Sequence, residues 1–129
     1  MERPEDRRKN TRLSIQLEAE LHLPGDAVYR GKTKNISFSG VYLECLKSSA
    51  IPVVNDPCTL KLILQSGPNP NIISFQCRVV RTDKSGAGIR FISVDMNGYR
   101  QFKNLLVYNS KDPDKLLDEL NRNPGLDIN

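Results

Sequence analysis

Aromatic residues are scarce in this chain of 129 residues, which has no tryptophan and only 6% aromatic side chains. Proteins that bind single-stranded nucleic acid without sequence preference usually stack the bases on a row of exposed aromatic side chains. No strand expected in this sequence carries such a row outward. A small β-barrel that binds single-stranded nucleic acid is therefore an alternative function rather than the leading hypothesis.

Long hydrophobic runs are also missing. No segment approaches about 18 consecutive apolar residues, the length that a membrane-spanning helix requires. The first nine residues have no apolar centre of the kind found in a signal peptide. We therefore expect a cytoplasmic protein that is not inserted in a membrane. A hydrophobic content of 38% allows one domain with one core.

Cysteine and histidine are too few and too far apart for most catalytic or metal-binding arrangements. The three cysteines, Cys45, Cys58 and Cys77, form no C-x-x-C pair, and His22 is the single histidine. Each cysteine shares strand parity with apolar neighbours, so we expect small buried side chains in a reducing compartment. The sequence also has no G-x-G-x-x-G or G-x-S-x-G motif. We expect no enzyme, no metal and no cofactor.

The formal net charge of +4 favours an anionic partner only weakly, but the charge is unevenly distributed. Residues 1–12 hold five basic and three acidic side chains without apolar periodicity, which predicts a flexible N-terminal arm. Residues 111–129 hold three basic and five acidic side chains, which predicts an acidic helical extension. We expect the folded domain to occupy residues 13–110.

Alternation of apolar and polar side chains with a period of two predicts that this domain is mainly β. The alternation is strongest in residues 13–23, where every odd-numbered position is apolar. Turn-forming residues separate this segment from five further candidate strands. These lie at residues 28–34, 41–45, 58–65, 72–82 and 87–92. Six antiparallel strands on short turns predict a small closed or nearly closed barrel.

After the last expected strand, the apolar period changes to that of a helix. Its apolar face consists of Met96, Tyr99, Phe102 and Leu106. We expect this face to pack on the mouth of the barrel, with Ser93 or Asp95 as the N-cap. A second short helix is expected at residues 112–120, with Asp112 as its cap and Pro113 at its first position.

The first candidate binding cluster is the arginine-rich arm, with Arg7, Arg8 and Arg12. A guanidinium group stays charged and offers five donors in a rigid plane, so it binds phosphate or the edge of guanine with two hydrogen bonds. It also stacks on base faces. An arm hinged before a rigid strand can fold back over a ligand on the barrel wall. A solvated basic tail is the alternative.

The second cluster is the hexapeptide N-I-S-F-S-G at residues 35–40. The amide of Asn35 can pair with the edge of a base, and the hydroxyl of Ser37 can donate to a phosphate oxygen. Gly40 allows either a close backbone approach or a positive φ. A polar β-turn without a ligand is the alternative.

Together these clusters carry a resemblance. The motif R-x-x-x-R at residues 8–12, followed by N-x-S-x-x-G at residues 35–40, resembles the two-part signature of PilZ domains. PilZ domains are receptors for the bacterial second messenger cyclic di-GMP. The segment G-I-R-F at residues 88–91 is similar to the later G-[IV]-x-F strand of that family. The resemblance covers about residues 7–95 and implies a six-stranded antiparallel PilZ-type β-barrel, mainly β, with one or two C-terminal helices.

The resemblance also implies roles for individual residues. In PilZ domains the two arginines, here Arg8 and Arg12, hold phosphate and guanine while the arm wraps the nucleotide. The position of Asn35 reads the guanine edge, where an aspartate would accept two N–H bonds as a charged partner. The position of Ser37 meets phosphate or guanine, and the position of Gly40 permits the turn.

A basic residue directly before the motif, here Arg7, tends in PilZ proteins to accompany a stacked pair of cyclic di-GMP molecules. The resemblance therefore implies two ligands in one site. Four further residues could flank the ligand from neighbouring positions. They are Ser39, Tyr42, Arg78 and Arg90.

The leading hypothesis is a non-catalytic cyclic di-GMP receptor and adaptor. Ligand binding would order the arm over the barrel wall and change a surface that an unidentified effector protein reads. Besides the nucleic-acid-binding barrel, a degenerate domain that only docks to proteins is a third possibility. The intact arginine pair argues against a degenerate domain.

Overall fold

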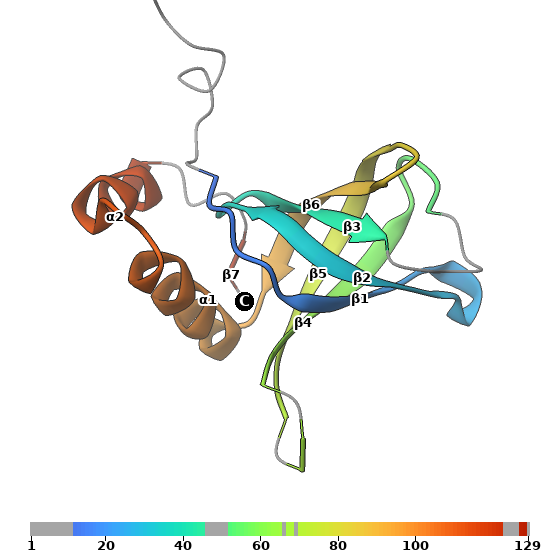
Figure 1. Ribbon diagram of the computed structural model, residues 1–129, viewed down its shortest axis with the longest axis horizontal. Helices are drawn as coiled ribbons and strands as arrows, with labels where there is room; N and C mark the ends of the chain where they lie inside the picture. The colour runs from blue at the N-terminus through green and yellow to red at the C-terminus, as the bar shows by residue number, and fades with distance from the viewer. Residues whose placement is uncertain (1–11, 46–51, 66, 69, 123–126, 129) are drawn as a thin grey trace, which may run out of the picture.

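The computed structural model describes residues 12–45, 52–65, 67–68, 70–122 and 127–128 (Figure 1). Within these residues, six antiparallel strands follow one another along the chain. They are β1 (Glu18–His22), β2 (Val28–Ile36), β3 (Gly40–Cys45), β4 (Pro57–Gln65), β5 (Asn71–Thr82) and β6 (Gly86–Val94). Their order is β3-β2-β1-β4-β5-β6, and β3 also pairs with β6, so the sheet closes into a barrel. This confirms the predicted mainly β, six-stranded antiparallel barrel.

The strand boundaries differ from the prediction at the start and the end of the chain. Residues 12–17, which we call the lead, keep the expected alternation of burial, yet regular β1 begins only at Glu18. An isolated bridge joins Leu13 of the lead to Ile36. A short strand, β7 (Asp127–Ile128), pairs in parallel with the end of β6 outside the barrel. Because β7 has only two residues, it shows no alternation of apolar and polar side chains, and the sequence could not predict it.

Two helices follow the barrel, α1 (Met96–Tyr108) and α2 (Pro113–Arg122). Both expected helices are therefore present. The carboxylate of Asp95 accepts a hydrogen bond from the Gly98 N–H at 2.6 Å, so Asp95 is the N-cap of α1. Asp112 accepts one from the Lys115 N–H at 3.1 Å at the start of α2. No helix among the described residues is long and apolar enough to cross a bilayer.

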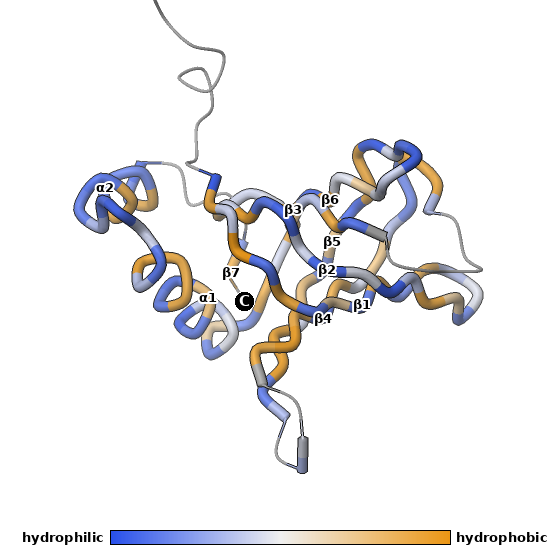
Figure 2. The backbone as a smooth tube through the Cα atoms, in the orientation of Figure 1, coloured by the Kyte–Doolittle hydropathy of each residue, from blue (hydrophilic) through white to orange (hydrophobic). Residues whose placement is uncertain are grey.

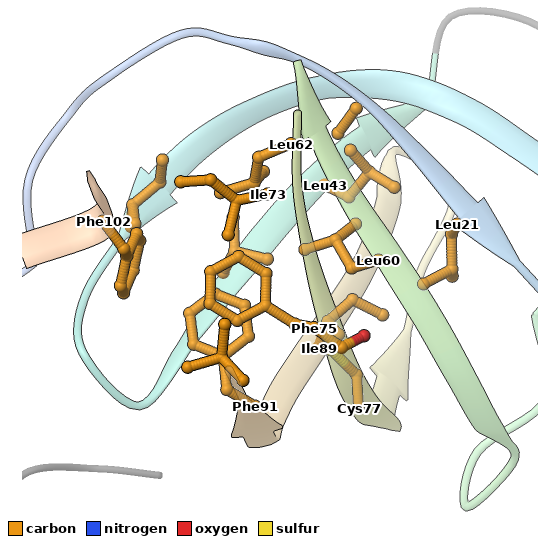
Figure 3. Packing of buried hydrophobic residues seen from close by; sticks show 14 of the residues in the cluster. Leu21, Leu43, Leu60, Leu62, Ile73, Phe75, Cys77, Ile89, Phe91 and Phe102 are labelled. Atoms are coloured by element: carbon orange, nitrogen blue, oxygen red, sulfur yellow. The ribbon is translucent and has the colours of Figure 1, made fainter. Parts of the chain in front are cut away.

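Four phenylalanines join the barrel interior to α1, which lies across one end of the barrel (Figure 1). Figure 3 shows three of them, Phe75, Phe91 and Phe102. Phe102 of α1 is fully buried, and its ring centre lies 5.0 Å from that of Phe75 and 5.3 Å from that of Phe91, edge-on in both cases. Phe38, from the turn between β2 and β3, meets the same ring edge-on at 5.9 Å. Each such pair contributes about 0.5–1.5 kcal/mol beyond the burial of its area.

Aliphatic side chains and two thiols fill the rest of the barrel, and Figure 2 shows apolar and polar residues alternating along its strands. Cys58 and Cys77 lie opposite each other on β4 and β5 as buried free thiols, as predicted. Burial raises the pKa of Cys58 to about 11 and also raises the pKa of Cys77. Both thiols therefore stay protonated at neutral pH. The predicted burial of Cys45 concerns a side chain outside the described residues.

The central position of Phe102 gives a test of the packing. Phe102→Ala should lower the free energy of unfolding by about 3–5 kcal/mol, because the cavity would open among three other aromatic rings. Tyr108→Ala on the same helix removes a side chain that is 93% exposed, and it should change stability by less than about 0.5 kcal/mol. Urea denaturation followed by circular dichroism measures both. Equal effects of the two substitutions would contradict the packing.

Candidate ligand-binding site

The turn between β2 and β3 is the centre of the candidate site. The Ser37 N–H donates to the Gly40 carbonyl at 2.9 Å and closes the turn. The Oγ of Ser37, whose side chain is buried, accepts from the Ser39 N–H at 3.2 Å and lies 3.0 Å from the Ser39 Oγ. Phe38 points into the core and fastens the turn to Phe102. The hydroxyl of Ser37 therefore holds the turn, and the half-buried Ser39 lies closer to solvent.

Gly40 lies where β3 closes the barrel against β6. It pairs with Arg90, and the adjacent Phe91 N–H donates to the Ser39 carbonyl at 2.9 Å. A Cβ atom on Gly40 would overlap the carbonyl oxygen of Ile89. Gly40 is not among the described glycines with a positive φ. Of the two sequence interpretations, the close approach of two backbones is the correct one.

Asn35 and Tyr42 lie opposite each other on the outer wall of the barrel. Tyr42 alternates along β3 with the buried side chains of Val41 and Leu43, so it faces outward. A register shift between Thr33 and Asn35 breaks the alternation of β2 and brings Asn35 opposite Tyr42. Directly opposed residues of antiparallel strands share a face. Asn35 thus shares the outer face of the barrel with Tyr42.

A cluster that the sequence did not predict extends this row across β6 to β5. Gly88 lies opposite both Tyr42 and Arg81. The Arg81 side chain fills the space over Gly88, where a Cβ would come within 2.7 Å of the Arg81 Cγ. The Arg81 Cζ lies 5.4 Å from the centre of the Tyr42 ring, within the range of a cation–π contact. The Tyr42 hydroxyl donates to Asp83 at 2.6 Å.

The hydrogen bond between Tyr42 and Asp83 changes the titration of both groups. Partial desolvation, then the hydrogen bond to Asp83 and its negative charge, raise the pKa of Tyr42 from 10.0 to about 12. The Tyr42 hydroxyl and the Ser85 N–H lower the pKa of Asp83. The carboxylate is therefore ionised at neutral pH, and it fastens the turn between β5 and β6 to the outer face of β3.

The other two predicted flanking arginines lie in the neighbouring row. Arg90 is exposed and lies opposite Gly40 on one side and Arg78 on the other. The Nη1 of Arg78 donates to the Asn55 carbonyl at 2.7 Å, which turns part of its guanidinium toward the segment before β4. With Arg81, these residues bring three guanidinium groups onto adjoining strands of the outer wall.

Of the three predicted arm arginines, Arg12 lies within the described residues, and Arg7 and Arg8 lie outside them. Arg12 is exposed. The next residue, Leu13, exchanges two backbone hydrogen bonds with Ile36, at 2.7 and 2.8 Å. In an antiparallel pairing the residue before Leu13 lies beside the residue after Ile36. The structure therefore brings Arg12 next to the turn that contains Ser37.

Sequence reasoning missed Arg81 because of a local irregularity in β5. Alternation that continues from the outward Arg78 gives Arg81 the inward parity. A register shift between Val79 and Arg81 reverses that parity and turns Arg81 outward. The one available signal was Gly88, since a glycine inside a strand often marks a close approach by another group.

The hydrogen bond between Tyr42 and Asp83 predicts how the ionisation of Tyr42 depends on pH. Because the folded-state pKa of Tyr42 lies above that of an unfolded tyrosine, its contribution to stability is complete below about pH 10 and is lost as the pH rises toward 12. Asp83→Asn keeps the acceptor oxygen but removes the charge, so it should shift the pKa of Tyr42 down toward 10. Carbon-13 NMR of the tyrosine rings measures this shift.

Asp118→Asn on α2 is the matched control, since that carboxylate pairs with Arg122. It should leave the Tyr42 titration unchanged. A Tyr42 titration that stays the same in Asp83→Asn would show that the hydrogen bond does not form in solution.

Comparisons with known proteins agree with this architecture. A family model described as PilZ domain matches residues 6–108. A search of curated proteins finds no match. Among solved structures, the chain is similar to the Bacillus subtilis inhibitor of motility (MotI/DgrA), with 17% identity and a TM-score of 0.60. That similarity covers 91% of this chain and 53% of the Bacillus protein, so this chain spans about half of its length.

A second similar structure is the PilZ domain of CeSA from a cellulose-synthesizing bacterium. It shows 14% identity and a TM-score of 0.55, and the similarity covers 74% of this chain and 93% of that domain. At these identities the two structures show a shared fold alone. The family match spans most of the chain and agrees with the closed six-stranded barrel. The chain therefore belongs to the PilZ domain family.

Proposed function

We propose that this PilZ domain is a non-catalytic receptor for cyclic di-GMP, which binds on the outer wall of the barrel. The observation that carries the proposal is the bridge between Leu13 and Ile36, which brings Arg12 beside Ser37 although the two are far apart in sequence. The resemblance on which the hypothesis rests requires the arginine arm and the polar turn to meet. A barrel that kept them on different faces could not bind one ligand with both.

The ligand would be held by charge and by shape. Arg8 and Arg12 bind phosphate and guanine, and Asn35 pairs with the guanine edge. Charge-assisted hydrogen bonds are about twice as strong as neutral ones. Ser37 is buried within the turn. Before the ligand binds, the groups of the turn that a ligand can reach are therefore its backbone and the side chain of Ser39. The rigid backbone at Gly40 fixes the distance between these groups and β6.

The outer wall adds positive charge to the site. Arg90 lies opposite Gly40, and Arg81 lies in the row of Asn35 and Tyr42. The carboxylate of Asp83 is turned to the Tyr42 hydroxyl at 2.6 Å. Two cyclic di-GMP molecules carry four phosphate charges, and Arg7 next to the motif adds one more cation for them. We therefore propose a stacked pair of ligands in this site.

Binding would order the arm and change the surface around it. Ordering a residue costs roughly 1–2 kcal/mol of conformational entropy, so the arm closes only when charge-assisted contacts offset this cost. The closed arm would form a new surface for an effector protein. The acidic extension at residues 111–129 is a second surface that such a partner would recognise. One structural neighbour is named an inhibitor of motility, which is consistent with a receptor that acts by docking to another protein.

The distribution of aromatic rings separates this proposal from binding of single-stranded nucleic acid. All eight aromatic residues of the chain lie within the described residues. The four phenylalanines and Tyr29 are buried, and Tyr42 is tied to Asp83 and Arg81. No row of rings remains on which successive bases could stack. A compact, highly charged dinucleotide suits the guanidinium-rich wall better.

Isothermal titration calorimetry with cyclic di-GMP tests the proposal. Wild-type protein should bind, and Arg12→Ala should weaken binding about 10-fold to 100-fold, since a hydrogen bond to a charged group contributes about 1.5–3 kcal/mol. The double variant Arg8→Ala, Arg12→Ala should lose binding. The titration should end at two ligands per chain, and Arg7→Leu should move that end point toward one.

Arg100→Ala provides the matched control, because Arg100 is an exposed arginine on α1. It should bind as the wild type does. Absence of heat with the wild type, or equal binding by the double variant, would remove cyclic di-GMP as the ligand. Binding of a single-stranded oligonucleotide in the same assay, with no response to cyclic di-GMP, would support the alternative.

A further inference from the structure

Three neighbouring segments cross the same part of the barrel with different numbers of residues. Between the same paired positions, the lead advances by four residues (13 to 17), β2 by three (33 to 36) and β3 by two (41 to 43). A regular ladder requires equal numbers. The backbone hydrogen bonds of the lead are therefore interrupted between its two contacts with β2.

The hydroxyl of Thr33 lies at this interruption. It accepts a hydrogen bond from the Leu17 N–H at 2.8 Å and donates one to the Ile15 carbonyl at 2.6 Å. Thr33 and Ser37 are the two buried polar side chains among the described residues, and Thr33 is 1% exposed. Buried backbone groups without partners are costly. One hydroxyl thus satisfies a donor and an acceptor that the change of register removes from the ladder.

Register changes on both sides of β2 begin at Thr33, and they determine where two of the site residues lie. Alternation from the inward Thr33 would give Asn35 the inward parity, and the shift instead brings Asn35 opposite the outward Tyr42. On the other side, a regular ladder from Leu17 would pair Leu13 with Ser37. The observed bridge pairs Leu13 with Ile36. Both register changes thus begin at Thr33, and the Thr33 hydroxyl bonds to the lead at the second of them.

We propose that Thr33 is the positioning residue of the site: its buried hydroxyl holds the lead in the register that carries Arg12 to the turn. Thr33 does not touch the ligand and acts through Arg12. Any side chain without a hydroxyl loses both hydrogen bonds at once. This inference rests on the proposed binding of cyclic di-GMP, and it concerns how the protein positions Arg12 rather than which ligand Arg12 binds.

Calorimetry with cyclic di-GMP on three variants of the full chain tests the inference. Thr33→Val keeps the shape but not the hydroxyl, and it should weaken binding about tenfold while the barrel stays folded. Thr33→Ser keeps the hydroxyl and should stay within about threefold of the wild type. Thr59→Val is the matched control, since Thr59 is a half-buried threonine on β4 whose hydroxyl has no hydrogen bond among the described residues. It should bind as the wild type does.

Introducing Thr33→Val into the Arg12→Ala variant distinguishes a positioning role of Thr33 from general loosening of the fold. In Arg12→Ala protein, Thr33→Val should weaken binding by less than about threefold, because the residue through which Thr33 acts is already missing. A folded Thr33→Val variant with wild-type affinity, or a full tenfold loss that persists in the Arg12→Ala background, would overturn the inference. A wild-type protein that does not bind cyclic di-GMP would instead remove the proposed function.

Amide hydrogen exchange provides a measurement that needs no variant. The Leu17 N–H donates to the Thr33 hydroxyl and should exchange slowly in the wild-type protein. Exchange of this amide at the rate of an unprotected residue would also overturn the inference, even where Thr33→Val does not fold.

Discussion

The pairing of β3 with β6 closes the barrel, and the rest of the structure depends on it. At this seam the two backbones approach so closely that Gly40 has no room for a side chain beside the Ile89 carbonyl. The Phe91 N–H bonds to the Ser39 carbonyl at the same place and fixes the polar turn. The candidate site is therefore part of the closure of the fold, and a change that loosened the seam would disturb both.

The two sides of the seam carry different kinds of interaction. On the inside, Phe38 packs against Phe102, so the turn is mechanically linked to the helix that covers the end of the barrel. On the outside, Tyr42 joins Arg81 and Asp83 in a row that begins at Asn35. The interior supplies rigidity through buried apolar area. The exterior carries charged and hydrogen-bonding groups at fixed positions, as the proposed binding of an anionic ligand requires.

Most of the fold could be predicted from the sequence because it depends on periodic patterns. Alternation gave the six strands, the change of period gave α1, and Asp95 was one of two candidate caps. The register shifts next to Asn35 and Arg81 could not be predicted, since they depend on which segments pair across the barrel rather than on local alternation. These shifts turn Asn35 and Arg81 outward. The sequence motifs identified candidate residues such as Asn35 and Ser37, but the contacts of Thr33 and Arg81 became visible only in three dimensions.

The central proposal is that the arginine arm and the polar turn meet on the outside of the barrel around a cyclic dinucleotide. The most direct test is the amide NMR spectrum of labelled protein, recorded while cyclic di-GMP is added. We expect shift changes in residues 35–42 and in the arm through Leu13, with Thr59 and Lys61 on the far strand β4 unaffected. Changes confined to β4 or to α2, or a spectrum that does not respond, would contradict it.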